Sequence, residues 1–278
     1  MKLLDKAIQF QKLHLANDIF VMANAWSAGS AILLEEAGLK AIGTTSAGIA
    51  FNRGLPDYEA ALSFEAALKE TRRIAEAVSI PVSMDAENGY GHSGNSVYEN
   101  MKHIAATGVV GASIEDYTGD NDSPLYNIEL AAERIVSAKE AVSDLEYPFT
   151  LTARAECYLT GHADPFNESV RRVNRYREAG ADCLFVPGIK DIETIKALVQ
   201  EVNGPVNVVM GLSGSPLSVA ELKNAGVTRI SIGGSLARAT FGLVRRAARE
   251  MLDHGTFEYS KQQIADDELC KLFSNRNV

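Results

Sequence analysis

Two carboxylates stand one residue apart at residues 83–91, where an apolar run breaks into glycines. Side chains alternate between faces in an extended chain, so Asp85 and Glu87 should point the same way and lie close together. Like charges held that close favour a cation between them, and Mg²⁺ or Mn²⁺ prefers carboxylate oxygens. The pair therefore indicates a magnesium or manganese site, with a solvated strand end carrying two unrelated acids as the alternative.

Further charged residues follow other apolar runs along the chain. They come directly after strand-like segments or in the loops beyond them: Asp57, Glu115, Asp116, Arg154 and Glu156. Acids with one arginine suit a divalent cation together with a carboxylate or phosphate-bearing substrate, because the guanidinium offers a planar two-pronged donor. The alternatives are a rim salt bridge from Arg154 to Glu156 or Glu115, and solvated loop acids.

The elements that must position these residues repeat along the chain. An amphipathic helix is predicted over residues 1–17, and eight units of strand followed by helix come after it. The strands are predicted at 19–26, 40–46, 81–85, 110–116, 149–154, 183–186, 206–210 and 229–232. Their helices are predicted at 28–37, 58–78, 95–106, 128–143, 168–179, 192–202, 218–225 and 236–252.

Near-continuous apolar strands of this kind indicate a parallel sheet that is buried on both faces. The economical closure is an α/β fold, a (β/α)₈ barrel, forming one domain over 1–278 with the barrel at 18–252 and a helical tail at 253–278. A doubly wound open sheet is the alternative, but no Gly-x-Gly-x-x-Gly turn follows the first strand. The tail carries a helical pattern near 262–273 and should pack on its own barrel or on a neighbouring subunit.

In such a barrel the active face lies at the carboxyl ends of the strands. This rule gathers Trp26, Ser46, Asp57, Asp85, Glu87, Glu115, Asp116, Arg154 and Glu156 at one rim. Weaker candidates are two glycine turns that would cradle an anion, at 211–215 and 232–235, and the loop histidines His92 and His162. Cys157 lies near the same rim and is interpreted as an inert thiol, because no partner base is evident.

The composition, 46% hydrophobic and 23% charged, is that of an ordinary globular protein. No apolar run is long enough to span a bilayer and nothing at the N-terminus resembles a signal peptide, so we expect a cytoplasmic protein. The net charge of -9 argues against nucleic acid or an acidic membrane surface as a partner. Three widely spaced cysteines, Cys157, Cys183 and Cys270, argue against a disulfide framework.

Five motifs together resemble the isocitrate lyase and phosphoenolpyruvate mutase superfamily. They occur in order at residues 45–48, 54–57, 85–91, 114–116 and 153–156. The resemblance implies a Mg²⁺-dependent barrel that binds a small 2-oxo carboxylate or its enolate. It also implies a homo-oligomer, a tetramer or dimer, in which the eighth helix is exchanged between subunits.

The resemblance also implies roles for individual residues. Asp85, Glu87 and Glu115 are expected to form the metal site, partly through bound waters, with Asp57 as a catalytic loop acid that supports the water shell. A metal that chelates a 2-oxo carboxylate stabilises the negative charge of an enolate where it develops.

Substrate contacts are implied in the same way. The backbone NH groups of Ser46, Ala47 and Gly48 are expected to hold the substrate carboxylate, with Arg154 as its catalytic partner. Further candidate substrate contacts are Trp26, which the barrel topology brings to the rim, and Asn121 in the loop after the fourth strand.

That loop departs from the superfamily's patterns. Its carbon–carbon lyases carry Lys-Lys-Cys-Gly-His there, and the cysteine donates a proton, whereas residues 116–123 read Asp-Tyr-Thr-Gly-Asp-Asn-Asp-Ser. Its phosphonomutases and phosphonopyruvate hydrolases place a lysine and an asparagine in the loop; Asn121 fits the second, and the lysine is missing. Positions that read the leaving group, near Pro187 and at 209–211, are replaced as well.

These departures favour a carbon–carbon lyase or decarboxylase, because decarboxylation needs neither a cysteine acid nor a phosphoryl clamp. Carbon–phosphorus chemistry of the mutase or hydrolase type is the first alternative. A non-catalytic barrel that binds a metabolite at the old metal site is the second.

Overall fold

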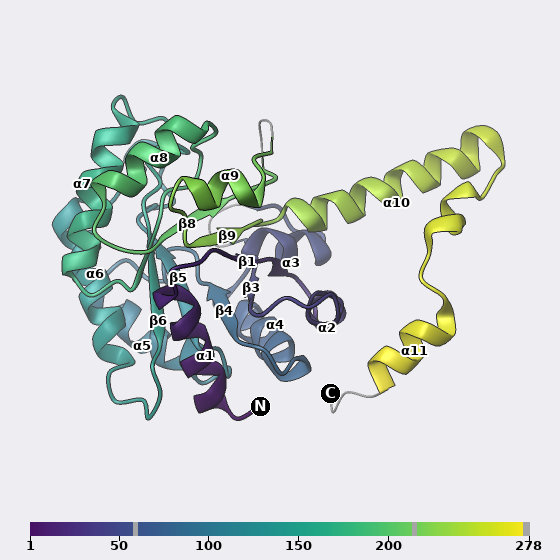
Figure 1. The fold of residues 1–278 in the computed structure, drawn as a ribbon, viewed down its shortest axis with the longest axis horizontal. Coiled ribbons are helices and arrows are strands. Elements are labelled where there is room, and N and C mark those ends of the chain that lie inside the picture. The colour runs from purple at the N-terminus through teal and green to yellow at the C-terminus, as the bar shows by residue number, and fades with distance from the viewer. Residues whose placement is uncertain (58–60, 213–215, 275–278) are drawn as a thin grey trace.

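Nine parallel strands form one sheet in the order β1-β9-β8-β7-β6-β5-β4-β3-β2. The computed structural model describes residues 1–57, 61–212 and 216–274, and in it the sheet curls into a nearly closed barrel with helices outside (Figure 1). The two end strands, β1 (Phe20–Met22) and β2 (Asn24–Ala25), are consecutive halves of the first barrel strand. Strand β1 pairs with β9 (Arg229–Ser231), and β2 pairs with β3 (Ile42–Thr44). The predicted (β/α)₈ barrel is confirmed, and the doubly wound open sheet is wrong.

The other elements lie close to their predicted positions. The strands are β4 (Val82–Asp85), β5 (Gly111–Glu115), β6 (Thr150–Arg154), β7 (Cys183–Phe185) and β8 (Val206–Val209). The helices are α1 (Leu3–Leu15), α2 (Ala28–Glu36), α4 (Phe64–Ala77), α5 (Gly94–Ala105), α6 (Ile128–Ala141), α7 (Pro165–Glu178), α8 (Ile192–Glu201), α9 (Val219–Asn224) and α10 (Ser235–His254).

The region after β3 differs from the prediction. A short helix, α3 (Ser46–Asn52), stands where a glycine-bearing loop was expected, because the Thr45 side chain caps it by accepting a hydrogen bond from the Gly48 NH. Helix α4 begins later than predicted, since Ser63 caps it through the Ala66 NH. Residues 58–60, where that helix was expected to start, lie outside the described residues.

The first barrel strand is interrupted at Ala23, and the side chain of Asn24 forms hydrogen bonds to the segments on both sides of that strand. Its Nδ2 donates to the Thr44 carbonyl at 2.6 Å, and its Oδ1 accepts from the backbone NH groups of Ile232 and Gly233 at 2.9 and 3.0 Å. One amide thus links β3 to the turn after β9, where the barrel closes.

Helix α1 covers the amino ends of the strands. Phe10 is fully buried there in a cluster with Phe20 and Met22, and the ring of His14 lies beside Phe20 with centroids 5.0 Å apart. The carboxyl ends on the other side of the barrel are left for the loops that carry the charged residues.

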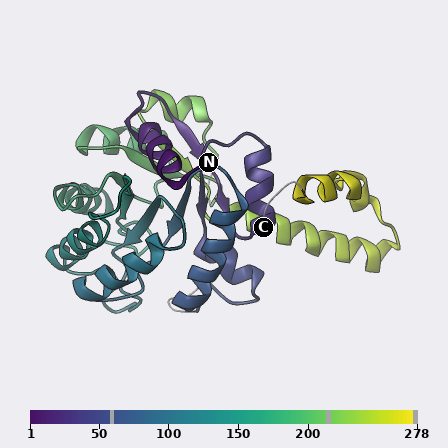
Figure 2. The ribbon, with the colours of Figure 1, turned by 90° about the horizontal axis from the view of Figure 1, so that it is seen from below.

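Helix α10 extends away from the barrel, as Figures 1 and 2 show. Only Ala237 and Ala247 of this helix are buried. A turn of 3₁₀ helix, η1 (Glu258–Gln262), reverses the chain, and α11 (Asp266–Ser274) returns so that Leu272 packs against the barrel core. Over residues 1–57, 61–212 and 216–274, no helix is both long and apolar enough to cross a membrane.

Candidate active site

A cavity of about 450 Å³ lies at the carboxyl ends of the strands. Most of the predicted site residues line it: Ser46, Ala47, Asp57, Asp85, Glu87, Glu115, Asn121 and Arg154. Trp26 and Gly48 are not among the lining residues; Trp26 packs against the barrel core instead. The topology therefore brings together the acids, the arginine and the loop asparagine that the sequence singled out.

The guanidinium of Arg154 lies among three acids. Because β5 and β6 pair with Glu115 opposite Arg154, Nη1 of Arg154 comes within 3.0 Å of Glu115 Oε2. The same nitrogen is 3.9 Å from Asp85 Oδ1, and Nε donates to Glu156. The rim salt bridge considered from the sequence is thus present, and a contact between Arg154 and a substrate carboxylate stays a prediction.

Three acids at this rim, Asp57, Glu115 and Glu156, have pKa values above their ordinary ones. Burial raises the pKa of Glu115 well above its ordinary value; the charge of Arg154 lowers it, and the neighbouring carboxylates raise it further. Burial and the charge of Asp85 likewise raise the pKa of Asp57, and burial raises that of Glu156 against the opposing effect of Arg154. One guanidinium does not offset the crowded acids, so a second positive charge would stabilise their ionised forms.

The start of α3 holds Asp85 in place. Its Oδ2 accepts hydrogen bonds from the Ser46 NH at 3.1 Å and from the Ser46 hydroxyl at 3.0 Å, and the Asp85 NH donates to Thr44 Oγ1 at 2.9 Å. Asp85 is therefore oriented by fixed donors. Binding of a substrate carboxylate by the same Ser46 NH stays a prediction.

Glu87 reaches the cavity by a different route from the one its spacing suggested. Strand β4 ends at Asp85, and Glu87 has a left-handed backbone with φ of 47°, so alternation along a strand does not place it. Tyr90, with φ of 53°, donates from its hydroxyl to Glu87 Oε1 at 2.8 Å. Such backbone is uncommon outside glycine and clusters at functional sites.

The donor set fits Mg²⁺ if the ion keeps part of its water shell. Over residues 1–57, 61–212 and 216–274, no three His, Cys, Asp or Glu side chains are placed to ligate one ion directly. Mg²⁺ is usually held by one or two carboxylates plus waters, and five acids line this cavity: Asp57, Asp85, Glu87, Glu115 and Glu156. The residues therefore suit an ion bound partly through water.

Asp116 has a structural place that its position beside Glu115 did not reveal. It is 2% exposed. Oδ1 accepts from the Glu156 NH at 2.9 Å, and Oδ2 accepts from Arg172 Nη1 at 3.0 Å and from the Tyr176 hydroxyl at 2.6 Å. This carboxylate positions the backbone of Glu156 rather than facing the cavity.

Several lining residues were missed from the sequence. They include Tyr117, Pro124, Leu159 and Thr160, whereas Leu212, which also lines the cavity, belongs to the glycine turn at 211–215. Tyr117 was within reach of sequence reasoning because it directly follows the fourth strand, and its hydroxyl donates to Asn121 Oδ1 at 3.1 Å. The others lie in loops without a chemical signature.

The weaker candidates separate into two groups. Gly233 and Gly234 line the cavity, whereas residues 213–215 of the other glycine turn lie outside the described residues. The loop histidines do not line it: His92 Nδ1 is 2.5 Å from the Tyr126 hydroxyl, and His162 accepts from the Asp164 NH. Burial raises the pKa of the Cys157 thiol to about 11, in agreement with an inert thiol.

The phosphoenolpyruvate phosphomutase family model matches residues 10–252. The chain belongs to that family. The crystal structure of a candidate lyase or mutase of Burkholderia cenocepacia is similar, with 43% identity, a TM-score of 0.94 and coverage of 98% of this chain and 97% of that one.

Two relatives of this chain have names that state different reactions. The 2-methylisocitrate lyase of Escherichia coli is 27% identical and the match covers 86% of this chain and 81% of that protein. A phosphonopyruvate hydrolase, crystallised with oxalate and Mg²⁺, is 26% identical with a TM-score of 0.87, covering 97% of this chain and 95% of that one. The chain is thus an enzyme of the isocitrate lyase and phosphoenolpyruvate mutase superfamily, whose members break carbon–carbon or carbon–phosphorus bonds.

Proposed function

We propose that this enzyme is a Mg²⁺-dependent lyase that acts on a small 2-oxo or 2-hydroxy carboxylate through an enolate. The observation that carries the proposal is the meeting of Asp57, Asp85, Glu87 and Glu115 in one cavity with Arg154. A relative crystallised with oxalate and Mg²⁺ supports it, because oxalate resembles a pyruvate enolate in which an oxygen replaces the CH₂ group.

When bound, the metal supplies positive charge that stabilises an enolate as it forms. Asp85 and Glu115 would hold the ion or its waters, and Ser46 orients Asp85. Arg154 offsets the acids beside the ion and offers a fork of donors to a substrate carboxylate. Tyr90 holds Glu87 facing the same cavity.

The loop after β5 favours carbon–carbon cleavage. Asp120 and Asp122 make its exposed part acidic, and an acidic loop is a poor partner for a phosphoryl group because like charges repel. Decarboxylation leaves neutral CO₂ and needs no phosphoryl clamp. Asn121, which lines the cavity, is the one observation that favours the carbon–phosphorus alternative.

A substrate panel tests this ranking. Purified enzyme with Mg²⁺ is assayed against oxaloacetate, a methylisocitrate-type substrate and phosphonopyruvate, with Asp85→Asn as the inactive comparison and Asp5→Asn, an exposed acid on α1, as the control. Release of pyruvate or a 2-oxo product from a carbon substrate, lost in Asp85→Asn only, supports the proposal. Turnover of phosphonopyruvate alone overturns the choice of bond, and Mg²⁺ binding without any turnover favours a metabolite-binding barrel.

We further propose that α10 packs against a second copy of the chain, so that the enzyme is a homo-oligomer. Apolar side chains along α10 and the turn beyond it are open to solvent: Phe241, Leu243, Val244, Leu252 and Phe257 are 42%, 44%, 61%, 85% and 62% exposed. A row of large exposed apolar residues on a helix that leaves its own barrel marks an interaction surface.

A further inference from the structure

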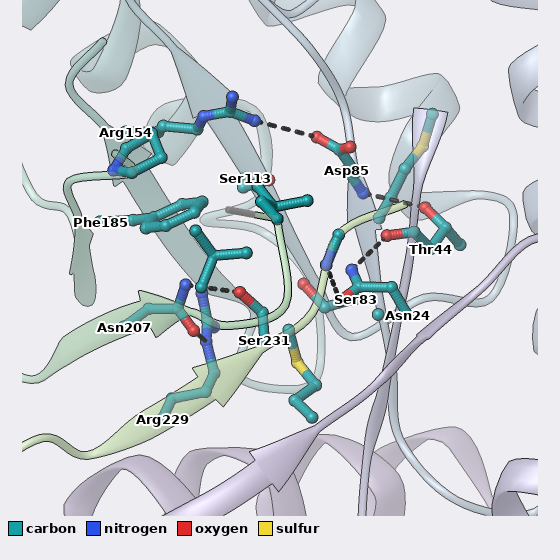
Figure 3. A pocket seen from close by; sticks show the side chains of 17 residues that line it. Asn24, Thr44, Ser83, Asp85, Ser113, Arg154, Phe185, Asn207, Arg229 and Ser231 are labelled. Atoms are coloured by element: carbon teal, nitrogen blue, oxygen red, sulfur yellow. Dashed lines mark hydrogen bonds and ion pairs between the residues drawn. The ribbon is translucent and has the colours of Figure 1, made fainter. Parts of the chain in front are cut away.

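A second cavity, of about 70 Å³, continues from the candidate active site into the barrel. Asp85 and Arg154 line one end, and Arg229, Asn207 and Ser231 line the other (Figure 3). Barrel interiors are usually filled by bulky branched side chains. Here small and polar residues lie among the larger ones that line the cavity, such as Met84 and Phe185, and leave a space that would hold roughly five water molecules or one small anion.

The far end of this inner cavity carries a buried positive charge. Arg229 is 2% exposed, and a guanidinium stays protonated in proteins. Its Nε donates to Asn207 Oδ1 at 2.8 Å, and its Nη1 lies 3.1 Å from His14 Nε2. Within the described part of the chain, no ion pair joins Arg229 to a carboxylate.

The partners of Arg229 are all neutral. Burial, and then the charge of Arg229, lower the pKa of His14 to about 3, so the ring is uncharged and offers Nε2 as an acceptor. His14 Nδ1 faces the Phe10 carbonyl at 2.9 Å, which fixes that tautomer. Asn207 contributes only an amide dipole, and burial lowers the pKa of Arg229 itself, the direction expected of a cation without a counter-charge.

Other buried arginines of the protein are compensated differently. Arg172 pairs with Asp116 and Glu168, and the partly buried Arg154 pairs with Glu115 and Glu156. Arg134 has no ion pair among the described residues, but it donates to the Asn88 and Gly91 carbonyls and lies over the Tyr126 ring, and it does not line the inner cavity as Arg229 does. An uncompensated buried charge is costly. Arg229 thus lacks a negatively charged partner, and it borders a space that is large enough for a small anion.

The polar groups beside Arg229 are arranged as donors. Asn207 Nδ2 donates to Ser231 Oγ at 2.9 Å. Because that hydroxyl oxygen already accepts a bond, its hydrogen remains available to a further acceptor. Guanidinium and hydroxyl donors therefore border the same end of the cavity, which is the pattern of an anion site rather than a cation site.

We propose that the inner cavity is an anion-binding subsite, in which Arg229 and Ser231 hold one carboxylate-sized monoanion inside the barrel. The anion is either a free small carboxylate or the second carboxylate of a substrate whose 2-oxo end lies at the acid cluster above. Only the second source rests on the proposed function.

Thermal unfolding tests the subsite directly. Sodium formate is compared with equimolar sodium gluconate, whose anion is too large for the cavity. Formate should raise the Tm of the wild-type enzyme by roughly 2–4 °C in a concentration-dependent manner, because it binds only the folded state. The shift should vanish in Arg229→Met and persist in Arg177→Met, which removes an arginine on α7 that donates to the Ala181 carbonyl. Equal Tm values of the wild-type enzyme in the two salts would overturn the proposal.

Bromide provides a readout that needs no variant. Crystals of the wild-type enzyme soaked in sodium bromide should show an anomalous peak beside the Arg229 guanidinium. A cavity without such a peak, in an enzyme whose Tm also ignores formate, contradicts the subsite.

Calorimetry distinguishes the two sources of the anion. With Mg²⁺ present, Arg229→Met is titrated with oxalate and with 3,3-difluorooxaloacetate, a 2-oxo dicarboxylate that has no hydrogen on C3 and cannot enolise by losing a proton. A loss of tenfold or more in affinity confined to the dicarboxylate assigns the subsite to the substrate. Unchanged affinities together with a formate response in the wild type assign it to a free anion. If neither compound binds the wild type, the proposed function fails while the formate result still judges the subsite.

Discussion

Glu115 is the acid on which the charge balance of the site depends most. Its side chain pairs with Arg154 and lies near the other carboxylates. Burial makes the largest contribution to its raised pKa. A divalent ion would reverse that penalty, because it stabilises the ionised carboxylate. The residue therefore links the observed electrostatics to the proposed metal.

Replacing Glu115 by glutamine should weaken Mg²⁺ binding by about 10–100-fold, as loss of a supporting ligand typically does. The amide keeps the shape of the side chain and removes only its charge. Isothermal titration of MgCl₂ into Glu115→Gln and into Asp5→Asn measures the effect. An unchanged affinity in Glu115→Gln would remove this residue from the metal site.

His14 makes folding stability depend on pH in a defined window. Its folded-state pKa is about 3, below the ordinary value of 6.5, so the unfolded chain binds more protons between those values. The contribution is complete above pH 6.5 and is lost as the pH falls below it, by at most about 1.4 kcal/mol per pH unit. Urea unfolding between pH 5 and pH 7 should show a steeper loss for the wild type than for His14→Gln; parallel slopes would contradict a buried neutral ring.

Three elements meet at Asp116: the end of β5, the start of the loop after β6, and α7. Its two oxygens accept from the Glu156 NH, from Arg172 and from the Tyr176 hydroxyl, and all of these groups are buried. Because Arg172 and Tyr176 come 56 and 60 residues later, no local pattern indicates the contact.

Asp116→Ala should lower the free energy of unfolding by about 3–5 kcal/mol, since it leaves the Arg172 charge buried with one acid fewer. Asp122→Ala, in the exposed part of the same loop, should change it by less than about 0.5 kcal/mol. Chemical denaturation of both variants gives the comparison. Similar small losses in the two would mean that water replaces the carboxylate.

The sequence predicted the helices and strands that depend on local residue patterns. Apolar runs located the eight barrel strands. Because active sites of such barrels lie at the carboxyl ends of the strands, the sequence also predicted that Asp85, Glu115 and Arg154 lie together, as they do in the cavity. The sequence did not predict the break at Ala23, where Asn24 forms hydrogen bonds to β3 and to the turn after β9. Likewise, helix α3 begins at a cap from Thr45, and the glycines that follow Thr45 in the sequence indicated a loop instead.

The whole molecule is elongated on one side because α10 leaves the barrel and the chain then returns through α11 (Figure 2). A monomer of this shape exposes the apolar residues of α10 to water, at a cost of about 25 cal/mol for each Å² of apolar surface. Association with a second copy would remove that cost and explain the direction of the helix.

Val244→Asp, at a position that is 61% exposed on α10, should convert an oligomer to a smaller species, because the interface would have to bury a charge. Val136→Asp on α6, at a position that is 38% exposed, should leave the assembly intact. Light scattering coupled to size-exclusion chromatography reports the mass. A wild-type enzyme that is monomeric at micromolar concentration would refute the assembly.

We propose that acids at the carboxyl ends of β4 and β5 hold one divalent ion together with a 2-oxo carboxylate. A crystal structure of the enzyme with MnCl₂ and oxalate, with data collected at the manganese absorption edge, tests this site directly. We expect one anomalous peak between Asp85, Glu87 and Glu115, with oxalate beside it. Manganese found elsewhere, or oxalate bound at the rim without the metal, would contradict this metal site.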